Sequence, residues 1–142
     1  MSNLEEHVVK PVAAGYRGEL LKGSTETLIL SLLTVEPMYG YQLVREMDSR
    51  SNGYFHLKEG TLYPALHRLE RDGLVVSNWW EDYRGGQTRR YYNITPEGQE
   101  RLLSMLREWE MFTGAVNLVA HPAAAMVGAP STNGYVAGKL AV

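Results

Sequence analysis

The chain has 142 residues, of which 44% are hydrophobic and 21% are charged, and its formal net charge is −2. This size and composition allow one small globular domain with an additional element. The absence of cysteine excludes disulfides, thiol nucleophiles and thiolate metal sites. The longest apolar run, residues 28–33, is interrupted by Ser31 and is far shorter than the roughly 20 residues of a membrane span. We therefore expect a cytoplasmic protein.

The first half of the chain is predicted to be helical. Residues 1–18 are polar and include Pro11, so we expect them to form a flexible arm. Leucines at helical spacing then predict a helix over residues 19–35, which starts only at Ser24 if Gly23 interrupts it. A second helix is predicted over residues 40–50, followed by a turn at residues 51–53.

A third helix is predicted over residues 59–72. Leu62, Leu66 and Leu69 recur at i, i+4 and i+7, which places them on one face, and Gly73 is a stop signal. Three short helices with a sharp turn before the third are typical of a helix-turn-helix domain.

Two strand-like runs follow, over residues 74–83 and 89–94. The glycine-containing segment between them, residues 84–88, predicts a hairpin loop. A hairpin directly after the third helix is a wing. The predicted fold is therefore mainly α with a small β-hairpin wing (α+β), a winged helix-turn-helix over residues 19–94.

The last predicted element is a helix over residues 95–119. Thr95 suits its N-cap and Pro96 its first position. It carries two apolar stripes, which one small domain cannot easily cover, so we expect a C-terminal dimerisation helix and a homodimer. The first stripe holds Leu102, Leu106, Trp109, Thr113 and Val116, and the second holds Met105, Phe112 and Val119. Residues 120–142, rich in Ala, Gly and Pro, are predicted to be a disordered tail.

The outward face of the third helix suits insertion into the major groove of DNA. With the leucines inward, its outer side presents small residues near the N-terminus and hydrogen-bonding or cationic ones beyond. These are Gly60, Pro64, His67, Arg68 and Arg71, with Thr61 and Tyr63 at the edges.

The wing and the second helix offer further candidate DNA contacts. Arg84, Arg89 and Arg90 lie near a Gly-Gly tip, and since neighbouring strand residues face opposite ways, only one of Arg89 and Arg90 should face DNA. Tyr39 and Tyr41 flank Gly40; we expect Tyr41 to point inward and Tyr39 outward, towards a phosphate. Of Trp79 and Trp80, we expect one to pack inward.

No arrangement of residues points to catalysis. His67 and Glu70 could form half of a metal site, but no other histidine has matching spacing. No Ser/His/Asp set, phosphate loop or HExxH string is present. We expect no enzyme activity, cofactor or metal.

Three segments, in order, resemble the PadR-like transcriptional regulators. They are MYGYQL at residues 38–43, EGTLYPALHRLERDGL at 59–74 and GGQTRRYYNIT at 85–95. The resemblance implies a winged-helix domain, a homodimer, repression of neighbouring genes and, in some members, a response to small aromatic ligands. The tail after Ala120 has no counterpart in the family pattern, and residues 24–27 are more polar than usual.

Two functions from different classes remain open. The first is a sequence-specific repressor that binds a pseudo-palindromic operator in double-stranded DNA and responds to an aromatic effector. Met105, Trp109 and Phe112 either hold that effector or form only the core of the dimer interface. The second is a winged-helix protein-interaction module that does not bind DNA. Arg68, Arg84 and Arg89 or Arg90 gathered on one surface would favour DNA, whereas acidic residues interspersed among them would favour the interaction module.

Overall fold

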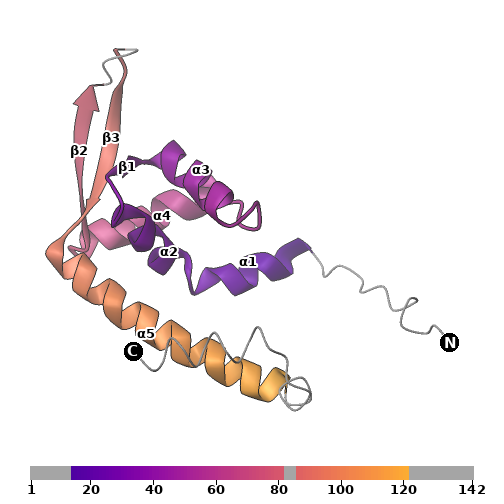
Figure 1. Ribbon diagram of the computed structural model, residues 1–142. Coiled ribbons are helices and arrows are strands. Elements are labelled where there is room, and N and C mark those ends of the chain that lie inside the picture. The colour runs from indigo at the N-terminus through magenta and orange to yellow at the C-terminus, as the bar shows by residue number, and fades with distance from the viewer. Residues whose placement is uncertain (1–13, 82–85, 122–142) are drawn as a thin grey trace.

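The computed structural model describes residues 14–81 and 86–121 (Figure 1). In chain order the elements are α1 (Ala14–Lys22), α2 (Thr25–Leu33), β1 (Met38–Tyr39), α3 (Gly40–Arg50), α4 (Glu59–Arg71), β2 (Val75–Glu81), β3 (Thr88–Ile94) and α5 (Pro96–Ala120). The tip of the expected wing, most of the expected N-terminal arm and nearly all of the expected tail lie outside the described residues.

The expected first helix is divided at Gly23, and the alternative start at Ser24 is confirmed, because Ser24 is the residue that precedes α2. α1 ends at Lys22 and α2 begins at Thr25, so the break falls at Gly23 and Ser24, where glycine lowers helix stability. Residues 14–18, which we expected in the polar arm, are helical. Sequence periodicity missed them because this short helix has no regular apolar stripe.

α2, α3 and α4 enclose the core, and they bury the apolar side chains at helical spacing that are named next. Their fully buried side chains include Ile29 and Leu30 from α2, Leu43 from α3, and Leu62, Leu66 and Leu69 from α4. α4 ends at Arg71, and Gly73, the predicted stop signal just beyond it, adopts a φ of +76°. This left-handed residue lets the Leu74 amide donate to the Leu69 carbonyl at 2.9 Å, closing the helix.

The sheet has three antiparallel strands in the order β1-β3-β2. The predicted hairpin is present, with Val75 opposite Ile94 and Glu81 opposite Thr88. β1, which pairs Met38 with Tyr92, was not predicted, because two residues are too few to show alternation. Figure 1 shows the β2–β3 hairpin projecting from the helical body as a wing. The chain is thus a winged helix-turn-helix, as predicted.

α5 leaves the domain from a fixed junction. Thr95 caps it as predicted: its hydroxyl accepts from the Gly98 amide at 3.0 Å and donates to the Gly73 carbonyl at 2.7 Å. Only Gly98 and Leu102 of this helix are buried. Its distal part therefore runs beyond the core (Figure 1).

Candidate nucleic-acid interface

The predicted outward face of α4 is exposed in the structure. Leu62, Ala65, Leu66 and Leu69 are buried, which turns the opposite side of the helix to solvent. The exposed residues are Gly60, Thr61, Tyr63, Pro64, His67, Arg68 and Arg71. Pro64 lies inside the helix and has no N–H, so the Gly60 carbonyl keeps its acceptor capacity on this face.

Tyr63 leans from α4 onto the start of α3. A Cβ atom at Gly40 would overlap the Tyr63 hydroxyl and lie 2.8 Å from its Cζ. Gly40 is therefore the residue type that allows the Tyr63 ring to rest there. Tyr63 is exposed, so this contact orients a ring on the surface where DNA would bind.

Acidic residues accompany two of the predicted arginines. Arg68 Nε donates to Glu26 on α2 at 2.8 Å. Arg90 is held more fully, since its Nε donates to Ser77 Oγ at 2.9 Å and its Nη2 donates to Glu70 on α4 at 3.0 Å. Among the described residues, no hydrogen-bond partner lies at the two terminal amino groups of Arg68, whereas Arg90 is committed to tying β3 to α4.

Arg89 lies on the other face of β3, as strand alternation predicted. Its guanidinium is 4.6 Å from the centre of the Tyr39 ring, a cation–π contact. Tyr39 in turn packs edge-on against Tyr91, with ring centres 5.3 Å apart. Arg84 lies outside the described residues.

The expected orientation of the two tyrosines around Gly40 was wrong. Tyr41 is 62% exposed, with Arg45 over its ring at 5.3 Å. Tyr39 is half-buried, because it belongs to β1 and packs between Tyr91 and Arg89. Without β1, the sequence could not show that Tyr39 had neighbours.

The expectation that one of the two tryptophans packs inward was also wrong. Trp79 is 66% exposed and Trp80 is 49% exposed. Both lie far along the hairpin, beyond the helices that cover its base. Trp80 packs only partly, against Tyr91 at 5.1 Å between ring centres.

Burial raises the pKa of the Tyr92 phenol above its ordinary range, and the positive charge of Arg90 opposes this rise.

Within residues 14–81 and 86–121, no three His, Asp or Glu side chains are grouped to hold a metal ion. None of the helices described is both long and apolar enough to cross a bilayer.

α5 exposes most of the side chains that predicted a dimer helix, whereas Leu102 is buried and Thr113 is half-buried. Trp109 is 49% exposed and Phe112 is 64% exposed, and both follow the last buried residue of the helix. Leu106, Val116 and Val119 are exposed as well. Met105 differs from its predicted partners because it is half-buried and packs against the core.

Comparison with known proteins identifies the family. The model of the transcriptional regulator PadR-like family matches residues 29–104. A transcriptional regulator of Mycobacterium tuberculosis is 36% identical over 92 residues, which are 65% of this chain and 81% of that protein. An uncharacterized protein of Lysinibacillus sphaericus is 34% identical over 93 residues, 66% of this chain and 84% of that one.

Solved structures agree with this result. A transcriptional regulator from Clostridium thermocellum is similar with a TM-score of 0.64 and 34% identity, covering 70% of this chain and 95% of that chain. A PadR-like regulator from Bacillus cereus has a TM-score of 0.63 and 31% identity, covering 72% of this chain and 97% of that chain. The chain therefore belongs to the PadR-like family and is a DNA-binding transcriptional regulator with a winged-helix fold.

Proposed function

We propose that the protein is a cytoplasmic, homodimeric repressor that binds a pseudo-palindromic operator and releases it in response to an aromatic ligand. The observation that carries the proposal is the exposed apolar side of α5. A 25-residue helix is about 38 Å long at 1.5 Å per residue. Large apolar side chains along such a length favour a partner helix, and a two-fold dimer supplies an identical one.

The dimer is tested by light scattering at micromolar concentration. Trp109→Glu places a charge on the stripe that follows Leu102 and should give a monomer. Met111→Glu is the matched control, because Met111 is exposed on the same helix but lies about 160° around the axis from Trp109 at 100° per residue. A monomeric wild type, or equal effects of both substitutions, would reject this interface.

A two-fold dimer implies a two-fold operator. Each α4 would enter the major groove of one half-site, with half-site centres about 34 Å apart or at a multiple of that spacing. Selection of bound sequences from random DNA should recover inverted repeats. Recovery of unrelated single sites would contradict the dimeric mode, and activation of a reporter by the bound protein would contradict repression.

The DNA contacts proposed here follow the exposed faces of α4 and the wing. The candidate residues are Tyr39, Gly60, Thr61, Tyr63, Pro64, His67, Arg68, Arg84 and Arg89, and Arg90 would support them by holding β3 against α4. Thr61, Tyr63 and His67 carry donors suited to base edges. Tyr39 supports binding through the Arg89 guanidinium that rests on its ring.

Substitutions of Arg89 and Arg90 distinguish a residue that contacts DNA from one that only holds the wing in place. Arg89→Ala should flatten the slope of log affinity against log salt by about 0.9, the value of one lost phosphate contact. Arg90→Ala should leave that slope unchanged and lower stability by at most about 1 kcal/mol, because the Arg90–Glu70 pair is partly exposed to solvent. Equal slope changes would show that Arg90 also reaches DNA.

The proposed effector site lies between the two α5 helices. Trp109 and its symmetry mate would face each other near the two-fold axis, and a planar molecule between them would stack on both indoles. Each ring pair would contribute about 0.5–1.5 kcal/mol beyond burial of apolar area. Phe112 would line the same space, and so would the part of the Met105 side chain that does not pack against the core. Separating the two α5 helices would change the distance between the two α4 helices. Binding of the ligand would thereby be coupled to binding of the operator.

Fluorescence titration with planar aromatic compounds tests this site. Saturable quenching of tryptophan emission should accompany release of the operator in the wild type and be absent in Trp109→Leu, which should remain dimeric. If Trp109→Leu responds as the wild type does, Trp109 has only a packing role.

A further inference from the structure

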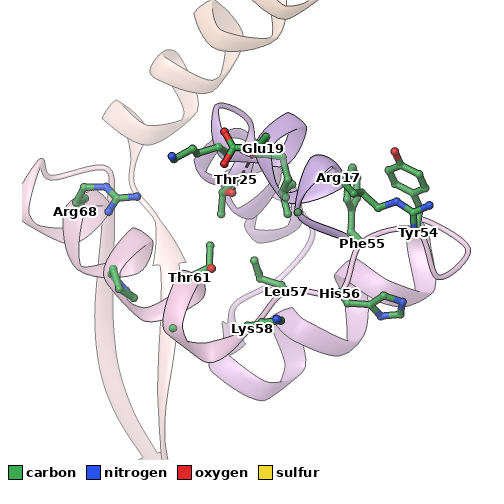
Figure 2. A pocket seen from close by; sticks show the side chains of 16 residues that line it. Arg17, Glu19, Thr25, Tyr54, Phe55, His56, Leu57, Lys58, Thr61 and Arg68 are labelled. Carbon is green, nitrogen blue, oxygen red and sulfur yellow. Dashed lines mark hydrogen bonds between the residues drawn. The ribbon is translucent and has the colours of Figure 1, made fainter. Parts of the chain in front are cut away.

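A groove runs beside the start of α4, the helix proposed to enter the major groove (Figure 2). Its volume is about 850 Å³, and its walls come from α1, the segment between α3 and α4, and the first turns of α4. Gly60 and Pro64, which belong to the exposed face of α4, also line it. The groove is therefore continuous with the surface that would read DNA.

The floor and the rim of the groove differ in chemistry. Leu57 and Thr25, each 4% exposed, lie at its floor. Four cations line it: Arg17 and Lys22 from α1, Lys58 immediately before α4, and Arg68 on α4 itself. Figure 2 shows Arg17 reaching towards Tyr54, and its guanidinium lies 4.1 Å from the centre of that ring.

Arg17, Lys22 and Lys58 differ from Arg68, Arg71 and Arg90 in their surroundings. Arg68, Arg71 and Arg90 each make an ion pair with a carboxylate. Among the residues that the structure describes, no carboxylate lies within ion-pairing distance of Arg17, Lys22 or Lys58.

Two other ionisable groups bear on the charge of the groove. Glu19 is its one acidic lining residue, and the charge of His56, when protonated, is offset by Asp48 at 3.6 Å. The groove thus carries a local positive charge in a chain whose net charge is −2. An exposed cluster of this kind, next to a DNA-reading helix, suits an anionic polymer that lies along it.

We propose that this groove is an additional DNA-contact surface, in which Arg17, Lys22 and Lys58 bind phosphates of the strand that passes beside the start of α4. The inference rests on the DNA binding assigned to the protein and extends it to α1. α1 lies before residue 29, where the match to the family model begins. The backbone contact would therefore add affinity and orientation to the base contacts of α4, without sequence information of its own.

The test is the salt dependence of operator binding by the full chain. Each of Arg17→Ala, Lys22→Ala and Lys58→Ala should reduce the slope of log affinity against log salt by about 0.9, and the triple variant by about 2.7. For one contact, this reduces the affinity lost between about 50 and 200 mM salt by about 3.5-fold. Arg107→Ala is the control, since it removes an exposed cation from α5.

Two further measurements make the test specific. Arg17→Lys and Lys58→Arg should keep the wild-type slope, because a phosphate contact requires charge rather than shape. Hydroxyl-radical footprinting should show sugars that are protected by the wild type and exposed with the triple variant. Because the three side chains are on the surface, thermal melting should be nearly unchanged.

The outcomes separate this inference from the proposed function. If the wild type binds an operator and the triple variant has the slope of Arg107→Ala, the groove does not contact DNA and the inference is overturned. If the triple variant keeps the wild-type salt slope but no longer releases the operator when the ligand is added, the inference is also overturned. The groove would then bind a small organic anion instead of DNA. If the wild type binds no DNA, the function itself fails.

Discussion

Gly98→Ala is expected to loosen the junction that aims α5. A Cβ at this position would overlap the Leu74 carbonyl oxygen and lie 2.8 Å from Ile94 Cγ1. The Leu74 carbonyl cannot move freely, because it accepts from the Thr95 amide at 3.0 Å. The added methyl group must therefore displace α5 from the base of the wing.

The size of the effect follows from two opposed terms. Overpacking a well-filled site costs about 1–3 kcal/mol, and exchanging glycine for alanine in a helix returns up to about 1 kcal/mol. We expect a net loss of about 1–2 kcal/mol. For a domain of this size each kcal/mol lowers Tm by about 4–8 °C. Because α5 carries the proposed dimer contacts, operator affinity should fall as well.

Thermal melting followed by circular dichroism measures the loss, with Gly60→Ala as the control. Gly60 is also helical, but a Cβ there meets nothing within 4 Å, so its stability should be unchanged or raised. If Gly98→Ala melts at or above the wild-type temperature, or both substitutions act alike, the junction is not as tightly packed as argued.

Three further substitutions test the cap, the core and the buried phenol. Thr95→Ala should cost about 1 kcal/mol by removing the cap of α5, and Thr95→Ser should recover it; equal melting of the two would contradict the capping role. Leu66→Ala should cost about 2–5 kcal/mol in urea unfolding, because Leu66 is 1% exposed, and a loss below about 1 kcal/mol would contradict its place in the core. Burial raises the pKa of Tyr92, so its contribution is fully present below the ordinary tyrosine pKa of about 10 and is lost as pH rises through the folded value. Tyr92→Phe should therefore lose less stability than the wild type between pH 9 and 11, and identical pH profiles would reject this.

The sequence alone determined the features that depend on local spacing. The leucines at i, i+4 and i+7 indicated α4 and its buried face, because helical geometry puts those positions on one side. Gly73 and Thr95 marked helix ends through backbone requirements that hold in any context. The segments around residues 38–43, 59–74 and 85–95 indicated the family that the comparisons confirm.

The tertiary structure decided which side chains meet across the chain. β1 exists only because β3 lies beside it, and that pairing buries half of Tyr39 and leaves Tyr41 exposed. Alternation showed that Arg89 and Arg90 face opposite ways, but only the position of Glu70 shows that Arg90 is tied to α4. The groove likewise joins α1 to Lys58, residues far apart in sequence. Spacing along a chain reports neighbours within one element, whereas contacts between elements depend on how their buried faces pack.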